Sequence, residues 1–473
     1  MVALKGPSCL LSDTISSMSD LVRTLIDEFG ADAVISGDQL FQRATSYWDS
    51  SPTKAKALLR LTSTEELSRA MRLCSKKKQS VVVQGGLTGV VEGAVATPDD
   101  VIISLERMSQ IESVDSMDGV AVIQAGAILQ VVQEQLAEQG FLFPLDLGAR
   151  GSCTIGGTVA TNAGGINVLR YGMMRNLVLG LEVVLADGTV ISSMNQMLKN
   201  NTGYDLKQLF IGSEGTLGIV ARVVVKLFPL PKSRQTAIFA AESFDAVVRV
   251  LKNMQAELAG TLSAYEVMWN NYYRSVTYEG AHKAPLDRDY PFYVIAEAEG
   301  ADPDADQERF ESLLQRGLES GDIVDAVLPK STAERDALWL VREDFDPALP
   351  AYLYDISLPI KAMTTYADRL EAAIAAWRAD AACLVFGHIA DGNLHIFVTP
   401  FDDGANHQAC DEIIYGCLDG LDGSISAEHG IGLDKKCWLA DSRSEDEIQL
   451  MRSLKGLLDP NNLLNPGKVI DPR

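Results

Sequence analysis

The sequence lacks any apolar run close to the 18 or so consecutive residues that a membrane-spanning helix needs. Its opening residues, MVALKGPSCLLSD, have no sustained apolar stretch with a cleavage site. Basic residues are in deficit, since 41 Lys and Arg face 64 Asp and Glu for a net charge of −23. Binding to nucleic acid needs clustered Lys and Arg, so a nucleic-acid partner is not expected. These absences predict a soluble protein without a transmembrane segment that is not exported.

Cysteine is sparse and is never spaced for a metal. The seven cysteines are scattered, their number is odd, and no Cys-x-x-Cys pair occurs. Neither an iron–sulfur cluster nor a cysteine-bound zinc is therefore expected, and reduced thiols in a cytoplasm are the favoured interpretation. A Gly-x-Gly-x-x-Gly fingerprint after a strand and a P-loop are also missing, which argues against a classical Rossmann domain and against NAD.

Glycine is concentrated in two stretches of the first half. Gly85-Gly86-Leu87-Thr88-Gly89 follows the strand-like run 81–83, and such a loop can present bare N–H groups to an anion, although an ordinary glycine turn explains it about equally well. The second stretch covers 151–158 and continues in 162–165. Because these small residues cannot fill a core themselves, a flat ligand is expected to pack against them.

The hydrophobic fraction of 47% predicts large buried cores, in about three domains at roughly 150 residues each or in two larger ones. After Pro231, strands and helices alternate without tight parallel crossovers, which indicates an α+β domain with an antiparallel sheet. The expected strands are Thr236–Ala241, Phe292–Glu299, Tyr354–Leu358, Leu384–Gly387 and Leu394–Thr399, and the expected helices are Phe244–Leu258, Asp304–Ser320, Thr332–Arg342, Thr364–Ala379 and Gln408–Leu421.

Three of the five histidines fall in two short motifs, His388 to His395 and Glu428-His429. Asp391-Gly392-Asn393 predicts a turn, which would place His388 and His395 on facing strands of a hairpin. Two imidazoles and one carboxylate can form a three-ligand metal site with open positions for water or substrate. A single histidine is more often a hydrogen-bonded interior residue, but the joint occurrence of the two motifs favours the metal.

Six motifs together resemble a known family. In order they are Gly85–Gly89, Thr154–Gly157 with Asn162–Gly165, Gly212–Gly218, His388 to His395, Glu428–Gly432, and Asn465–Lys468. This order resembles the FAD-linked D-2-hydroxyacid dehydrogenases of the vanillyl-alcohol oxidase/p-cresol methylhydroxylase superfamily, the group with the D-2-hydroxyglutarate and D-lactate dehydrogenases and the glycolate oxidase flavin subunit. The resemblance covers about residues 45–470.

The resemblance implies an α+β fold in which a two-subdomain FAD-binding domain of the vanillyl-alcohol oxidase type is joined to an α+β cap with an antiparallel sheet. The implied parts are an N-terminal helical segment at 1–50, the FAD-binding domain at 51–231, the substrate and cap domain at 232–423, and a C-terminal segment at 424–473 that returns to the FAD site.

FAD is the cofactor that the resemblance implies. Members with covalently attached flavin use a histidine in or near the first glycine loop, or a second attachment residue. No histidine precedes His282 here, so non-covalent FAD is expected. The implied FAD-binding residues are Gly85, Gly86, Leu87, Thr88, Gly89, Pro144, Leu145, Gly151, Ser152, Thr154, Gly156, Gly157, Asn162, Ala163, Gly164, Ile219, Asn465 and Lys468.

The implied reaction oxidises a D-2-hydroxy acid to the 2-oxo acid by hydride transfer to flavin N5. His388, His395 and Glu428 would bind a divalent metal, with zinc expected and manganese as the alternative. His429 would be the general base, and Arg342 would bind the substrate carboxylate. Without the family match, a surface arginine paired with the next residue, Glu343, is the alternative interpretation of Arg342. Electrons would leave to a non-oxygen acceptor such as an electron-transfer flavoprotein, a quinone or a cytochrome.

Three positions depart from the hydroxyglutarate-oxidising members, where a Thr, a Lys and an Asn help to bind carboxylate. Asp346, Leu353 and Phe397 stand there, allowing one residue of uncertainty in the alignment. They join Arg342 and His429 as expected substrate-binding residues. A second substrate carboxylate is therefore less expected than a neutral tail.

Two other functions stay open at this point. One is a flavin-carrying subunit of a larger oxidase complex, and the other is redox-neutral exchange like that of the alkyl-glycerone-phosphate synthases. A D-2-hydroxyglutarate dehydrogenase proper is the alternative within the favoured class. The sequence leaves the oligomeric state open, with a homodimer as one option.

Overall fold

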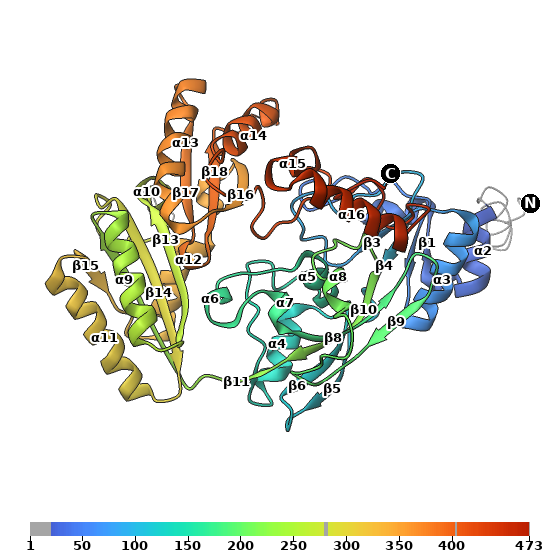
Figure 1. The fold of residues 1–473 in the computed structure, drawn as a ribbon, viewed down its shortest axis with the longest axis horizontal. Helices are drawn as coiled ribbons and strands as arrows, with labels where there is room; N and C mark the ends of the chain where they lie inside the picture. The colour runs from blue at the N-terminus through green and yellow to red at the C-terminus, as the bar shows by residue number, and fades with distance from the viewer. Residues whose placement is uncertain (1–19, 279–281, 403, 473) are drawn as a thin grey trace, which may run out of the picture.

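The computed structural model describes residues 20–278, 282–402 and 404–472, and the chain forms two lobes joined near β11 (Phe228–Pro229) (Figure 1). Of the expected N-terminal helical segment, residues 1–19 lie outside the described part. The rest of it holds α2 (Asp20–Phe29) and the 3-10 turns Ala31–Ala33 and Gly37–Gln42. In the described ranges, no helix is both long and apolar enough to cross a bilayer.

The first lobe is built on two sheets. The smaller one has the order β1-β2-β4-β3, with β2, β4 and β3 parallel, and the larger one is antiparallel with the order β5-β6-β10-β8-β9. The smaller sheet comprises β1 (Val34–Ile35), β2 (Ala57–Arg60), β4 (Val101–Ser104) and β3 (Val81–Gln84); the larger comprises β5 (Ile111–Asp115), β6 (Val120–Gln124), β10 (Ile219–Lys226), β8 (Val178–Val184) and β9 (Val190–Ser193).

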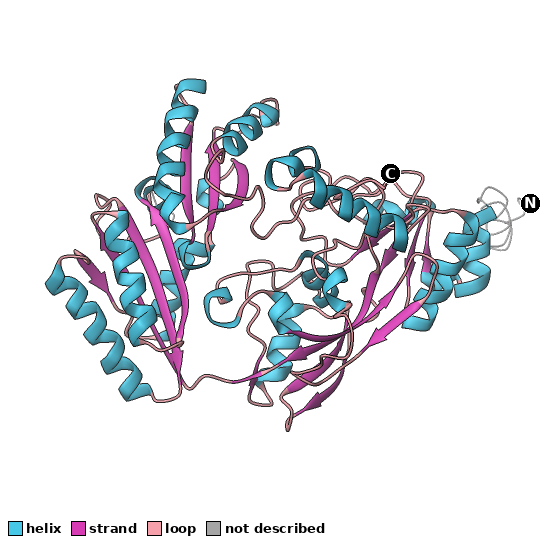
Figure 2. Ribbon diagram, viewed as in Figure 1, coloured by secondary structure: helices cyan, strands magenta, loops and turns pink. Residues whose placement is uncertain are grey.

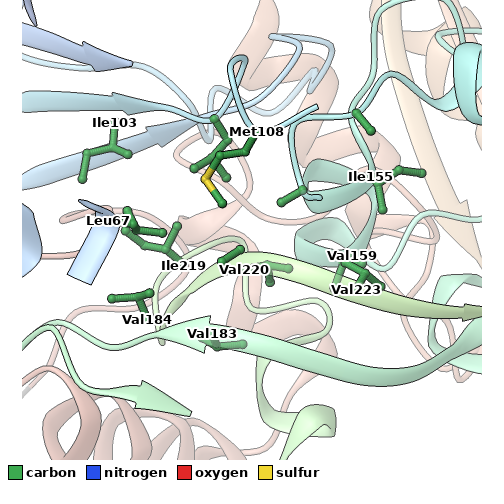
Figure 3. Packing of buried hydrophobic residues seen from close by; sticks show 14 of the residues in the cluster. Leu67, Ile103, Met108, Ile155, Val159, Val183, Val184, Ile219, Val220 and Val223 are labelled. Carbon is green, nitrogen blue, oxygen red and sulfur yellow. The ribbon is translucent and has the colours of Figure 1, made fainter. Parts of the chain in front are cut away.

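One apolar core joins these sheets to the helices of the first lobe. Figure 3 shows Ile103 from β4, Leu67 from α3, Ile155 from α5 and Val223 from β10 packed around it. Ser63 starts α3 by accepting a hydrogen bond from the Glu66 N–H, as its capping motif predicts. The helices are α3 (Thr64–Lys77), α4 (Leu129–Ala137), α5 (Ile155–Thr161), α6 (Val168–Tyr171), α7 (Met174–Leu177) and α8 (Lys207–Phe210), and the short strand β7 (Phe141–Leu142) pairs with β11.

The second small-residue stretch does fill a core, contrary to expectation. It forms α5, which buries Ile155 and Val159. A Cβ added at Gly156 would lie 2.6 Å from the Ala125 Cβ, so the missing side chain lets the helix approach β6 closely. At least Gly156 therefore serves the packing of α5 against β6, and fewer residues of this stretch are available to contact a ligand.

The second lobe is a seven-stranded sheet in which every pair is antiparallel, as predicted, with the order β15-β12-β14-β13-β17-β18-β16. Helices cover the sheet face shown in Figure 2. The strands are β12 (Ser233–Ala241), β13 (Leu262–Trp269), β14 (Phe292–Gly300), β15 (Asp325–Val327), β16 (Tyr352–Ser357), β17 (Ala382–His388) and β18 (Asn393–Thr399).

Two apolar clusters cover the two faces of this sheet. One contains α9 (Phe244–Glu257), α11 (Pro303–Ser320), α13 (Met363–Trp377) and α14 (His407–Gly416), and the other contains α10 (Asn270–Thr277) and α12 (Thr332–Glu343). Most of these elements match the sequence expectation within a few residues. The sequence did not predict β13 in the middle of the sheet, the edge strand β15, or α10 on the second face.

The C-terminal segment crosses back to the first lobe, where α15 (Leu439–Ser442) and α16 (Glu445–Leu458) lie in Figure 1. A bridge between Val81 and Leu464 and the hydrogen bond from the Val81 N–H to the Leu463 carbonyl attach the last residues to β3. The buried Lys455 ammonium donates to Asp459 at 2.6 Å and to the Thr216 and Leu464 carbonyls at 2.9 Å each. These bonds fix the chain end beside the first glycine loop.

Candidate active site

The hairpin of β17 and β18 carries two of the predicted metal ligands. The 3-10 turn Ile389–Asp391 and Gly392, at φ 92°, reverse the chain as the sequence predicts. In the register of the hairpin, His395 pairs with Phe386, and the His388 and His395 rings come to 5.3 Å between centroids. The two imidazoles therefore meet on one face of the sheet.

Glu428 completes this group from the C-terminal segment. Ligand atoms of His388, His395 and Glu428 all lie within 4.8 Å of one another. Glu428 Oε1 accepts the Gly165 N–H at 2.6 Å, and Oε2 lies 4.0 Å from His388 Nε2. A Cβ added at Gly164 would lie 2.5 Å from Oε1. Two imidazoles and a carboxylate at this spacing fit a divalent metal, placed directly against the second glycine stretch.

Glu266 on β13 supports this group and was missed by the sequence analysis. Its fully buried carboxylate contacts His388 Nδ1 at 2.6 Å and accepts from Arg342 Nε at 2.9 Å. Burial opposes its ionisation, but the two cations outweigh burial and lower the pKa of Glu266. The available signal was a single charged residue in the otherwise uncharged run 262–269.

The same contact orients His388. Burial disfavours the charged ring, yet the Glu266 carboxylate outweighs burial and raises the pKa of His388 to about 9. Glu266 engages Nδ1, which leaves Nε2 as the nitrogen that faces Glu428. A metal-binding histidine commonly has its other nitrogen bonded to a carboxylate in this way.

Arg342 ends α12 inside the lobe and not on its surface. Its exposed fraction is 6%, its guanidinium lies 4.5 Å from the Phe386 ring centroid, and its ion-pair partner is Glu266. The alternative of a surface arginine paired with Glu343 is therefore wrong. Arg342 lies on the side of the sheet that carries the histidines, where it can bind an anion.

Asp355 on β16 is a second buried carboxylate that the sequence analysis missed. Its Oδ2 accepts the N–H groups of Ala427, Glu428 and His429 at 3.0, 2.8 and 3.0 Å. Burial opposes ionisation, but the Lys435 ammonium and the N–H of Glu428 lower the pKa of Asp355. Ligand atoms of Asp355, His395 and His429 also lie within 4.8 Å of one another. Three donors already occupy Oδ2, so we interpret Asp355 as a carboxylate that holds the main chain of 427–429 in place.

His395 and His429 are neutral imidazoles near pH 7. Burial lowers the pKa of His429, despite the opposing Asp355 carboxylate, and burial together with Arg342 lowers the pKa of His395 well below the usual range. The His429 side chain keeps 28% of its surface exposed. A neutral, accessible imidazole beside the metal-ligand group can accept a proton.

The predicted FAD-binding residues divide by exposure. Leu145, Ile219, Asn465 and Lys468 are 1–3% exposed. Their side chains pack inside the protein, and Ile219 lies in the core shown in Figure 3. Pro144, Thr154, Gly156 and Gly164 are also buried, whereas Gly85, Gly86, Leu87, Thr88, Gly89, Gly151, Ser152, Gly157, Asn162 and Ala163 keep accessible surface.

The buried members of this set hold the loops in place. Asn465 Oδ1 accepts the Val83 N–H at 2.9 Å, and Lys468 Nζ donates to the Val95 carbonyl at 2.7 Å, so both brace the chain around the first glycine loop. A Cβ at Gly86 would collide with the Ser152 carbonyl, which packs this loop onto the second stretch. The two glycine stretches therefore adjoin and form one cradle, the surface on which a dinucleotide is expected.

The predicted substrate residues are partly brought together. Leu353 pairs with Phe397, and Asp355 pairs with His395 two residues further along β16. Side chains two residues apart on a strand point to the same face, so all four lie on one face of the sheet. Phe397 is 4% exposed, because the Phe345 ring covers it at 5.3 Å between centroids. Leu353 is half-buried, and Asp346 is exposed in the 3-10 turn Asp346–Ala348.

Comparison with known proteins gives the family. Residues 230–469 match the model of the C-terminal domain of FAD linked oxidases, and residues 55–193 match an FAD binding domain. The D-2-hydroxyglutarate dehydrogenase of Bos taurus is 41% identical over 422 residues, or 88% of this chain and 77% of that protein. The enzyme of the same name from Xanthomonas citri is 39% identical over 86% of this chain and 88% of its own length, and a putative D-lactate dehydrogenase of Schizosaccharomyces pombe is 36% identical over 88% and 82%.

Among solved structures, p-cresol methylhydroxylase with bound substrate superposes with a TM-score of 0.75 at 15% identity, covering 96% of this chain and 98% of that one. Alkyldihydroxyacetonephosphate synthase gives a TM-score of 0.72 at 19% identity, over 96% and 86%. These likenesses confirm the expected fold. The chain belongs to the FAD-linked oxidase family. Within that family it is an FAD-linked D-2-hydroxyacid dehydrogenase.

The prediction of a cytoplasmic location is wrong. The relatives from Bos taurus, Rattus norvegicus and rice are all named as mitochondrial proteins, which points away from the cytoplasm. Scattered, unpaired cysteines indicate only a compartment that keeps thiols reduced, and they do not identify which one.

Proposed function

We propose that the chain oxidises a D-2-hydroxy acid with non-covalent FAD and a divalent metal held by His388, His395 and Glu428. The convergence of these three donors against Gly164 and Gly165 carries the proposal, because it puts a metal-binding group beside the flavin cradle. Zinc suits the donor set, with manganese as the alternative. The proposed electron acceptor is an electron-transfer flavoprotein, a quinone or a cytochrome, and a homodimer remains the proposed assembly.

When bound, the metal would acidify the substrate hydroxyl and FAD would accept a hydride from the adjacent carbon. His429, neutral near pH 7, takes the hydroxyl proton. Arg342 binds the substrate carboxylate, and its bond to Glu266 fixes the direction of the guanidinium. Glu266 keeps the His388 imidazole oriented, and Asp355 holds the main chain that carries Glu428 and His429.

Acid denaturation should release all of the flavin as free FAD. The first lobe offers no histidine for a covalent link, since the first histidine after the start of the chain is His282 in the second lobe. The measurement is absorbance and mass of the supernatant and of the precipitated chain. Flavin that stays with the denatured chain would contradict the prediction.

The substrate tail is expected to be neutral. A buried second carboxylate needs cationic or hydrogen-bonding partners, whereas an apolar tail gains about 25 cal/mol per Å² by burial, and Leu353 offers such a surface beside His395. The test is kcat/KM for D-lactate, a longer aliphatic or aromatic D-2-hydroxy acid, D-malate and D-2-hydroxyglutarate with one acceptor. Leu353→Ala should reduce the advantage of the longer apolar tail. If the wild type has its highest kcat/KM with a dicarboxylate, the prediction of a neutral tail is wrong.

A further inference from the structure

Glu214 lies in the motif 212–218, which the sequence singles out and to which the proposed function gives no role. We propose that Glu214 is a positioning residue that fixes the metal ligand Glu428 and the base His429 relative to the flavin-binding lobe. The inference rests on the proposed function, since it takes the roles of Glu428 and His429 from it.

The first observation is how the segment 427–432 is held. As described above, Asp355 of the second lobe accepts its first three N–H groups. Ser426 Oγ accepts the Gly430 N–H at 3.0 Å. Glu214 of the first lobe accepts the last two, with Ile431 bonded to Oε1 at 2.7 Å and Gly432 to Oε2 at 2.9 Å. Side chains thus bind every N–H of the segment, and the two carboxylates come from opposite lobes.

The second observation is how Glu214 itself is fixed. Its N–H donates to the Ala160 carbonyl in α5 at 2.8 Å, and its own carbonyl accepts from Asn465 Nδ2 at 2.6 Å. Its φ of 51° lies in the left-handed region, which a glutamate adopts only when its surroundings impose it. Because α5 belongs to the second glycine stretch, Glu214 connects the flavin cradle to the segment that carries Glu428.

The third observation is the close contact at Gly430. A Cβ added there would lie 2.7 Å from Glu214 Oε1, and the residue has φ 88°. The carboxylate therefore lies against the chain only two residues after Glu428 and one after His429. With Glu214 removed, Asp355 and Ser426 would still bind the first four N–H groups, but the segment would lose its carboxylate anchor on the first lobe, and Glu428 would be held less firmly between Gly165 and His388.

The test compares Glu214→Ala with Glu182→Ala in FAD-loaded protein. Glu182 is a matched control, because it is also a buried carboxylate of the first lobe, bonded to Thr64 Oγ1 at 2.6 Å and to Ser192 Oγ at 3.0 Å. Two quantities are measured: the dissociation constant for Zn²⁺ by competition with a coloured chelator, and the anaerobic rate of flavin reduction by a D-2-hydroxy acid.

Glu214→Ala is expected to keep FAD, to weaken Zn²⁺ binding by about 10–100-fold and to slow flavin reduction by a similar factor, the usual effect of losing a partner that orients a metal ligand. Glu214→Gln, which keeps one acceptor oxygen, should recover part of both losses, and Glu182→Ala should keep wild-type values. A merely structural role for Glu214 predicts equal effects of the two alanine variants.

Wild-type Zn²⁺ affinity and wild-type reduction in Glu214→Ala would overturn the inference. If that variant does not retain FAD, Gly430→Ala decides, because its methyl group would push against the Glu214 carboxylate and should produce the same losses; wild-type values there would overturn the inference. The proposed function fails separately, if the wild type binds no Zn²⁺ or if His395→Ala binds it as tightly as the wild type does.

Discussion

His388→Ala and His395→Ala are each expected to lose the metal and to slow flavin reduction by about 10³-fold or more. Lewis-acid stabilisation is worth several kcal/mol, and each 1.4 kcal/mol or so is a factor of ten in rate. Ligand atoms of His388, His395 and Glu428 lie within 4.8 Å of one another, so each residue can supply one donor to the same ion. Removal of either histidine leaves the ion with two of these three donors. Metal content per chain and the anaerobic reduction rate are the measurements.

The matched control is His407→Ala. His407 lies at the start of α14 with a half-exposed side chain and contacts Asp411, away from the hairpin ligands. It should keep the metal and the wild-type rate, and the flavin spectrum should be unchanged in all three variants. Wild-type metal content in His395→Ala would show that the ion is held elsewhere.

His429→Ala is expected to keep metal and FAD but to slow flavin reduction by about 10²–10⁴-fold, the range for a lost general base. His429 is not one of the three proposed ligands but lies next to Glu428 in the chain. Its side chain keeps 28% of its surface exposed, and burial lowers its pKa, so the ring is neutral and can accept a proton. Stopped-flow reduction under anaerobic conditions, with metal content checked in parallel, measures the effect. An unchanged rate near neutral pH would remove His429 as the base.

The pH dependence gives a second check on His429. Only the neutral ring accepts a proton, so the wild-type rate should fall as pH falls through the pKa of His429 and should be full above it. Since that pKa is lowered, the midpoint should lie below the ordinary histidine value of about 6.5. The His429→Ala variant should lose this limb of the profile, and a midpoint above 6.5 in the wild type would contradict the assignment.

The sequence predicted the parts of the site that depend on local geometry. A Gly-containing turn between two apolar strands places His388 and His395 face to face. Strand and helix patterns after Pro231 likewise predicted an antiparallel α+β lobe. These features follow from residues close together in the chain, which a single sequence displays.

The parts that could not be predicted depend on contacts between distant segments. Glu266 reaches His388 only because β13 pairs with β17, and no local pattern gives that pairing. Asp355 and Glu214 act through the main chain of 427–432, which carries no side-chain signature. The packing role of Gly156 could not be predicted, because a sequence does not tell whether a glycine lies against a helix, a sheet or a cofactor.

The most direct test of the account is anaerobic flavin reduction by a D-2-hydroxy acid in protein stripped of metal by a chelator and then reloaded with Zn²⁺ or Mn²⁺. FAD should stay bound throughout. We expect the D-2-hydroxy acid to bleach the flavin fast in the reloaded protein and only slightly in the stripped protein. The L-enantiomer should bleach the flavin in neither protein. Equal reduction rates with and without metal would contradict the proposal that His388, His395 and Glu428 hold an ion that activates the substrate.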